Sequence, residues 1–201
     1  EYICIADGVN EYVTYTDDRK KDKMIDLIDK VVESKHLSVL EHVAIAYAIS
    51  GVSRSLLAQY SRHRIGNSLS VQSQRFVNAK KFDFVIPESI RDSNFDVPYE
   101  TLMQEIQMLY NSMVEGGVPK EDARFILPNA TTTNMTVTAN LRSLMDIYDK
   151  RVRVPGAQWE IKEMVQQMAD KACEREPWLK KYFEVEKHKE GYPIWEPEGH
   201  Y

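Results

Sequence analysis

The sequence contains little cysteine. Its 201 residues include only Cys4 and Cys173, too few for a disulfide scaffold, so we expect reduced thiols in a cytoplasmic protein. Neither has the neighbourhood of a nucleophile, because Cys4 falls in an apolar stretch expected to be a strand and Cys173 near the end of an amphipathic helix. A mechanism that depends on a cysteine nucleophile is therefore disfavoured.

Long hydrophobic runs are also missing. No stretch approaches the roughly 18 apolar residues of a membrane span, and no signal peptide is recognisable. The formal net charge is -5, whereas a general nucleic-acid binder is usually basic over a broad surface. No glycine-rich fingerprint follows a strand, so a Rossmann-type site is not expected. The length and ordinary composition predict a single domain over residues 1–201.

Residues 59–77 are the most informative stretch, because cations and hydroxyl groups gather there without a carboxylate. The segment is QYSRHRIGNSLSVQSQRFV, with the cations Arg62, His63, Arg64 and Arg75. Arginine offers a planar fork that stays charged and suits phosphate groups. In an acidic protein, such a cluster favours one small anionic ligand over a polymer. Taken alone, it is equally consistent with a solvated basic helix end.

A helix is expected to lead into this cluster. Ser53 can cap its N-terminus and Gly66 can end it, around an apolar stripe of Leu56, Leu57 and Tyr60. On such a helix Gln59, Arg62 and His63 share a face. Beyond Gly66 we expect a loop rich in hydroxyl and amide groups.

The arrangement Arg62-His63-Arg64, eight residues, then Ser73-Gln74-Arg75-Phe76-Val77 resembles the signature of flavin-dependent thymidylate synthases. That family's pattern is Arg-His-Arg, seven or eight residues, and Ser. Its members methylate deoxyuridine monophosphate (dUMP) using FAD. Further similar segments run from about His36 to Ile161: His36-x-Ser38-x-x-Glu41-His42, Ala123-Arg124-x-x-Leu127-Pro128, Asn140-x-Arg142-Ser143-Leu144 and Ala157-Gln158-Trp159-Glu160-Ile161. The first 35 residues match poorly, which we interpret as divergence or truncation.

The resemblance implies a reaction and a set of site residues. The reaction takes dUMP, methylenetetrahydrofolate and NADPH to dTMP in a homotetramer whose sites are shared between subunits. Arg151 is implied as the catalytic residue, lying on the uracil edge. The residues implied for dUMP are Gln59, Arg62, Ser73, Gln74, Arg75, Arg124 and Arg151, with Arg124 reaching a neighbouring subunit's site. The residues implied for FAD are His36, Ser38, Arg62, His63, Arg64, Asn140, Arg142 and Asp146.

Some positions depart from the family pattern. The Asn-Glu pair often found before the motif serine is here Val71-Gln72, and Asp146 stands where some members carry Asn. Any role of the missing glutamate is absent or passes to Gln72. Ser73 is interpreted as a binding residue, because no histidine-carboxylate pair is recognisable beside it.

We expect an α+β fold with a mainly antiparallel sheet and flanking helices, like that of the family. Alternation predicts strands over 43–49 and 131–139, and the run 82–87 reads as another strand, ended by a proline. We expect a turn at Ser50-Gly51 and a loop over 88–97. Asn140 should cap a helix that ends near Arg151 and carries an Arg142–Asp146 ion pair. A long helix ending at Gly116-Gly117 should bury the stripe Leu102, Ile106, Leu109 and Met113.

Three alternatives stay open. A metal site at His36, Glu41 and His42 is disfavoured, because their spacing does not match the His-Glu-x-x-His pattern, and we hold Glu41 and His42 as structural. A nucleotide-binding regulator that lost catalysis would be colourless and take up no FAD. A single-stranded nucleic-acid binder would show salt-dependent binding to an oligonucleotide.

Overall fold

The computed structural model describes residues 3–5, 18–74 and 81–184. It is an α+β structure with a four-stranded sheet in the order β1-β2-β4-β3, in which every pairing is antiparallel. The strands are β1 (Ile3–Ile5), β2 (Ala44–Ser53), β3 (Asn67–Val71) and β4 (Thr132–Asn140). The expected fold class is confirmed. Arg75, Phe76 and Val77 of the motif lie outside the described residues.

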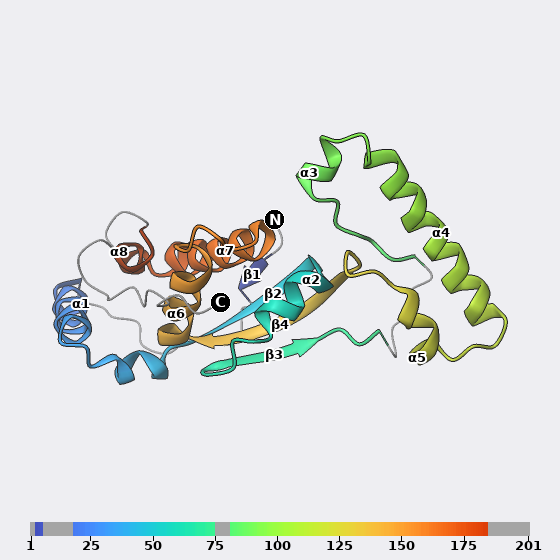
Figure 1. Cartoon of the computed structure of the whole chain (residues 1–201). Helices are drawn as coiled ribbons and strands as arrows, with labels where there is room; N and C mark the ends of the chain where they lie inside the picture. Colours follow the sequence, from blue (N-terminus) through green and yellow to red (C-terminus); the bar gives the residue numbers. More distant parts are fainter. Residues whose placement is uncertain (1–2, 6–17, 75–80, 185–201) are drawn as a thin grey trace, which may run out of the picture.

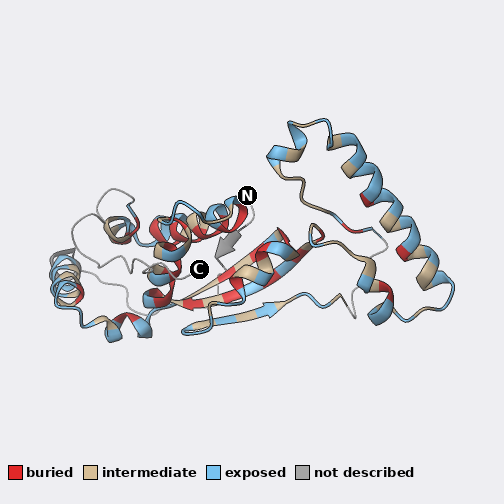
Figure 2. Ribbon diagram, in the orientation of Figure 1, coloured by how far each residue is buried: buried red, intermediate tan, exposed pale blue. Residues whose placement is uncertain are grey.

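Helices cover one face of the sheet (Figure 1). Residues that alternate along β4, such as Met135 and Val137, pack with residues of α2 (Arg54–Tyr60), α6 (Leu141–Arg151) and α7 (Trp159–Arg175). Figure 2 shows the buried residues gathered between these helices and the sheet. The other elements of this part of the chain are α1 (Asp18–Glu33), η1 (Leu37–His42), η3 (Pro177–Leu179) and α8 (Lys180–Phe183).

A second group of helices stands away from this core (Figure 1). It contains α3 (Glu88–Arg91), α4 (Asp96–Glu115), α5 (Lys120–Ala123) and η2 (Arg124–Ile126). The prediction of which face α4 buries is wrong. Leu102 and Leu109 are 51% and 53% exposed, while Met103 and Tyr110 are buried. The helix turns that other face toward residues 82–85, where Tyr99 donates to the Val85 carbonyl at 3.1 Å.

The path into and out of α2 differs from expectation. The prediction of a turn at Ser50-Gly51 is wrong, because β2 continues to Ser53 through a bulge in which Gly51 has φ 72°. Ser53 caps α2 as expected, its hydroxyl accepting from Leu56 N–H at 3.0 Å. The helix ends at Tyr60, so Arg62 and His63 do not share a helical face with Gln59, and Gly66 does not end it.

The segment expected to be a hydroxyl-rich loop is the strand β3. Its Ser68 and Ser70 are exposed and alternate with half-buried neighbours, so the serines belong to the open face of a strand that pairs with β4. The strand expected over 82–87 is reduced to one bridge, Phe84 to Thr131. The loop expected over 88–97 contains α3 and the start of α4.

Helix α6 follows the prediction except for its ion pairs. Asn140 caps it by accepting from Ser143 N–H at 2.8 Å, and it ends at Arg151. The expected Arg142–Asp146 pair is wrong, because Arg142 pairs with Glu41 and Asp146 pairs with Lys150. No helix among the described residues combines the length and apolar character needed to cross a membrane.

Candidate functional site

Arg151 forms the centre of the site, at the C-terminal end of α6. Its Nε donates to Nε2 of His63 at 2.9 Å, and its Nη2 lies 3.3 Å from the backbone carbonyl of Gln59. His63 and Gln59 come from the end of α2 and the turn after it, 88 and 92 residues away in the chain. The fold therefore joins three residues that the sequence separates into two segments.

His63 is set up to be neutral. Burial, and then the positive charges of Arg151 and Lys150, lower its pKa from 6.5 to about 4, against a smaller opposing effect of Asp146. At neutral pH its Nε2 is therefore an acceptor, as the bond from Arg151 requires. Burial and the charge of Arg62 likewise lower the pKa of Arg151. A partly desolvated guanidinium beside a second cation is a strong site for an anion or a polarised carbonyl.

The loop after His63 is joined to the N-terminus of α6. Ser143 Oγ donates to the Ile65 carbonyl at 2.8 Å, and Asn140 N–H donates to the Gly66 carbonyl at 2.8 Å. Gly66 has φ 60°, and a Cβ there would lie 2.2 Å from Ser143 Oγ, so only glycine allows this approach. The contact places the Arg-His-Arg segment next to Asn140 and the first turn of α6.

The remaining residues expected to bind FAD lie around this contact. Arg142 forms a half-exposed ion pair with Glu41 of η1 at 2.5 Å. His36 and Ser38 are exposed, just before and within η1, which packs beside α6. Arg62 and Arg64 are exposed on the segment after α2, and Asp146 lies one turn beyond Arg142.

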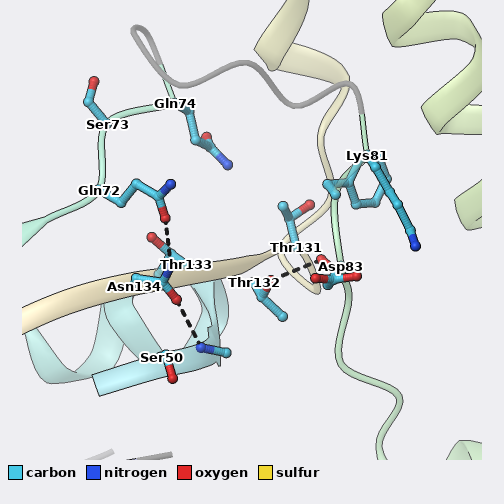
Figure 3. Close-up of a pocket in the computed structure, with 12 residues that line it drawn as sticks. Ser50, Gln72, Ser73, Gln74, Lys81, Asp83, Thr131, Thr132, Thr133 and Asn134 are labelled. Atoms are coloured by element: carbon cyan, nitrogen blue, oxygen red, sulfur yellow. Dashed lines mark hydrogen bonds between the residues drawn. The ribbon is translucent and has the colours of Figure 1, made fainter. Parts of the chain in front are cut away.

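Ser73 and Gln74 lie at the other end of β3, beside a polar cavity of about 400 Å³ (Figure 3). The cavity wall includes the beginning of β4, where Asn134 donates to Gln72 Oε1 at 3.0 Å and accepts from Gly51 N–H at 3.1 Å. The amide oxygen of Gln72 is thus engaged by a neighbouring strand. Thr131, also in the wall, has a buried hydroxyl without a hydrogen-bond partner.

Sequence reasoning missed Arg54. Its pKa is lowered by burial and then by the charge of Arg124, so the two guanidiniums lie near one another although 70 positions separate them. Arg124 Nε donates to the Glu121 carbonyl at 3.1 Å, and neither arginine forms an ion pair within the described ranges. One signal was available, since Arg54 is the first residue of α2, where the helix dipole disfavours a cation.

Within one chain these groups occupy the two ends of β3 and β4. His63, Arg151 and Asn140 lie at the end where Asn67 pairs with Ala139. Ser73 follows the other end, five strand residues away, a distance of roughly 15 Å at about 3.3 Å per residue. Arg54 is joined to that end, its N–H donating to the Thr131 carbonyl at 3.0 Å.

A profile of the family described as "Thymidylate synthase complementing protein" matches residues 3–178. The chain belongs to this family. Relatives named flavin-dependent thymidylate synthase include those of Nitratidesulfovibrio vulgaris, 37% identical over 158 residues, and Geobacter sulfurreducens, 41% identical over 145 residues. A third, from Halobacterium salinarum, is 34% identical over 200 residues.

The matches cover at least 70% of this chain and a smaller share of each relative. They include 74%, 70% and 86% of this chain, and 64%, 61% and 80% of the three relatives in the same order. The chain thus spans less than two thirds of the length of the first two.

Among the residues that the structure describes, no group of three or more His, Cys, Asp or Glu could hold a metal ion.

Proposed function

We propose that this chain is a flavin-dependent thymidylate synthase. It would convert dUMP, methylenetetrahydrofolate and NADPH to dTMP, tetrahydrofolate and NADP. Family membership supports this activity. The single observation that carries the proposed chemistry is the bond from Arg151 Nε to a neutral His63, which aims a guanidinium from a partly buried position.

Arg151 would activate the pyrimidine. Its terminal nitrogens would lie against the O4 and N3 edge of uracil, where a positive charge favours enolate character and makes C5 nucleophilic. His63 would hold the guanidinium plane by accepting from Nε, and the Gln59 carbonyl would fix its other end. Both contacts exist before substrate arrives, so little reorganisation is needed when charge develops on the ring.

An enzyme thiolate would play no part. Cys173 is buried, and burial together with Asp170 raises its pKa to about 11, which keeps it protonated at neutral pH. The activation of dUMP would therefore depend on electrostatic polarisation by Arg151 rather than on a covalent bond to the ring.

The donor set near α6 is suited to FAD. His36, Ser38, His63, Arg64, Asn140, Arg142 and Asp146 would hold it, and the Gly66 contact supports this by placing the Arg-His-Arg loop beside Asn140. Arg142 would exchange Glu41 for an anionic group of the cofactor, because their ion pair is half-exposed and weak. The flavin, when bound, would supply the hydride that NADPH provides.

The phosphate of dUMP would be held at the opposite end of β3. Ser73 and Arg75 are the expected ligands, with Arg124 reaching in from a neighbouring subunit. The proximity of Arg54 to Arg124 supports an anion beside that arginine. Because this end lies far from Arg151 in one chain, a homotetramer with sites shared between subunits would bring the two halves together. A cytoplasmic location stays a prediction from the two cysteines.

The proposed function is tested by the visible absorption spectrum of the protein and by one variant. The purified protein should show a flavin absorption spectrum that changes on adding dUMP, and it should form dTMP. Arg151→Ala should still bind dUMP but form dTMP at a strongly reduced rate. Normal methylation by this variant would refute the activation model, and a colourless protein that binds dUMP without taking up FAD would favour a regulator.

A further inference from the structure

Helix α2 is fastened at both ends by side chains from other helices. At its C-terminal end, Arg151 lies 3.3 Å from the Gln59 carbonyl and donates to His63 in the following turn. At its N-terminal end, Glu160 of α7 contacts Ser53. A helix of seven residues has little stability of its own. Together with the burial of Leu56 and Tyr60 in the core, these contacts therefore determine where Gln59 and His63 lie.

Glu160 uses both carboxylate oxygens on one residue. Oε1 accepts from Ser53 N–H at 2.7 Å, and Oε2 accepts from the Ser53 hydroxyl at 2.5 Å. The same hydroxyl oxygen accepts from Leu56 N–H at 3.0 Å, which is the cap of α2. Ser53 is 2% exposed and Glu160 9% exposed, so water competes little for these bonds. The chain of contacts runs from α7 through Ser53 into the first turn of α2.

Packing alone does not explain a charged side chain at the position of Glu160. It forms no ion pair with any lysine or arginine in the described part of the chain. Its place in the first turn of α7 favours a negative charge, and hydrogen bonds to a charged acceptor are stronger than neutral ones. Burying a carboxylate without a cation costs the free energy of its hydration, and an apolar side chain at the same place would not carry this cost. What the carboxylate adds is direction, because two bonds to one serine fix the orientation of α2.

We propose that Glu160 is a positioning residue for the methylation reaction. Through Ser53 it sets the orientation of α2, and so the placement of Gln59 and of His63 against Arg151. This inference rests on the proposed function. In the described part of the chain its hydrogen bonds go to Ser53 and not to a residue proposed to bind substrate or cofactor, so its effect would pass through the helix.

The test compares isosteric and hydroxyl variants of the full chain. Glu160→Gln keeps the shape but loses the charge and one acceptor, and Ser53→Ala removes the hydroxyl. Each should raise the KM for dUMP about tenfold, the equivalent of one charged hydrogen bond, with circular dichroism and melting temperature close to wild type. Ser53→Thr, which keeps a hydroxyl, should restore KM. The matched control is Glu163→Gln, on the exposed side of the same helix.

The outcomes separate the two proposals. If wild type forms no dTMP, the proposed function fails and the positioning role falls with it. If wild type is active while Glu160→Gln has the kcat and KM of Glu163→Gln, only the positioning role is overturned. If Glu160→Gln and Ser53→Ala both lose their folded structure, the carboxylate stabilises the fold rather than the site, and the inference is also overturned.

Discussion

Replacing Arg151 by lysine would separate charge from geometry at the centre of the site. Lysine keeps a positive charge but has one terminal nitrogen, so it cannot donate to His63 and contact the Gln59 carbonyl with a rigid fork. Losing the bond from Nε costs about 1.5–3 kcal/mol. If that loss falls on the transition state, the rate of methylation drops about 10- to 150-fold, at about 1.36 kcal/mol per decade.

The assay is a single turnover, with the bound flavin reduced beforehand and dTMP measured over time. Binding of dUMP is measured separately through the flavin spectrum, so that weak binding is not mistaken for slow chemistry. Arg153→Lys is the matched control. Arg153 donates to Asp149 and to the Tyr182 carbonyl, so its loss should lower the melting temperature and leave the single-turnover rate unchanged. A wild-type rate for Arg151→Lys would show that charge alone suffices and would refute the role of the fork.

Three further predictions follow from the same region. The unfolded chain protonates His63 near pH 6.5 and the folded chain near 4. Because the unfolded state then binds more protons, stability should decrease as pH falls through that window. Thermal melts against pH would measure this, and His63→Gln should flatten the dependence. Gly66→Ala should cost about 1–2 kcal/mol from its left-handed backbone alone, and more because its Cβ overlaps the α6 cap. Urea melts would show this against Gly156→Ala, whose Cβ meets nothing within 4 Å. Arg54→Gln should leave stability unchanged or higher, because it removes repulsion from Arg124, while weakening dUMP affinity about tenfold. Unchanged affinity in a titration would exclude Arg54 from the phosphate site.

The sequence predicts elements best where one hydrophobic period acts alone. The alternation of β4, the cap at Asn140 and the end of α6 near Arg151 all agree with the structure. The serine-rich segment was misread, because one face of β3 is open to solvent and its serines carry no apolar period. The bulge at Gly51 was also missed, since its left-handed residue keeps the strand going where a turn was expected.

The candidate site divides in the same way. The motif predicts Arg62, His63 and Ser73 as site residues, but it could not say that His63 accepts a bond from Arg151, because that contact depends on how α2 meets α6. Arg54 was missed for a related reason, since its relation to Arg124 depends on a tertiary approach between distant segments. The ion pair of Arg142 with Glu41 of η1 likewise joins distant segments, so the spacing of residues along one helix could not predict it.

The distance between the two ends of β3 has a genetic consequence. A chain damaged at Arg151 and a chain damaged at Arg124 would each be inactive alone, because every site built from identical copies repeats the same defect. If the sites are shared between subunits as proposed, the two chains co-expressed in one cell would form mixed assemblies in which some sites take Arg151 from one chain and Arg124 from the other. Two null alleles of this gene would then complement each other in trans.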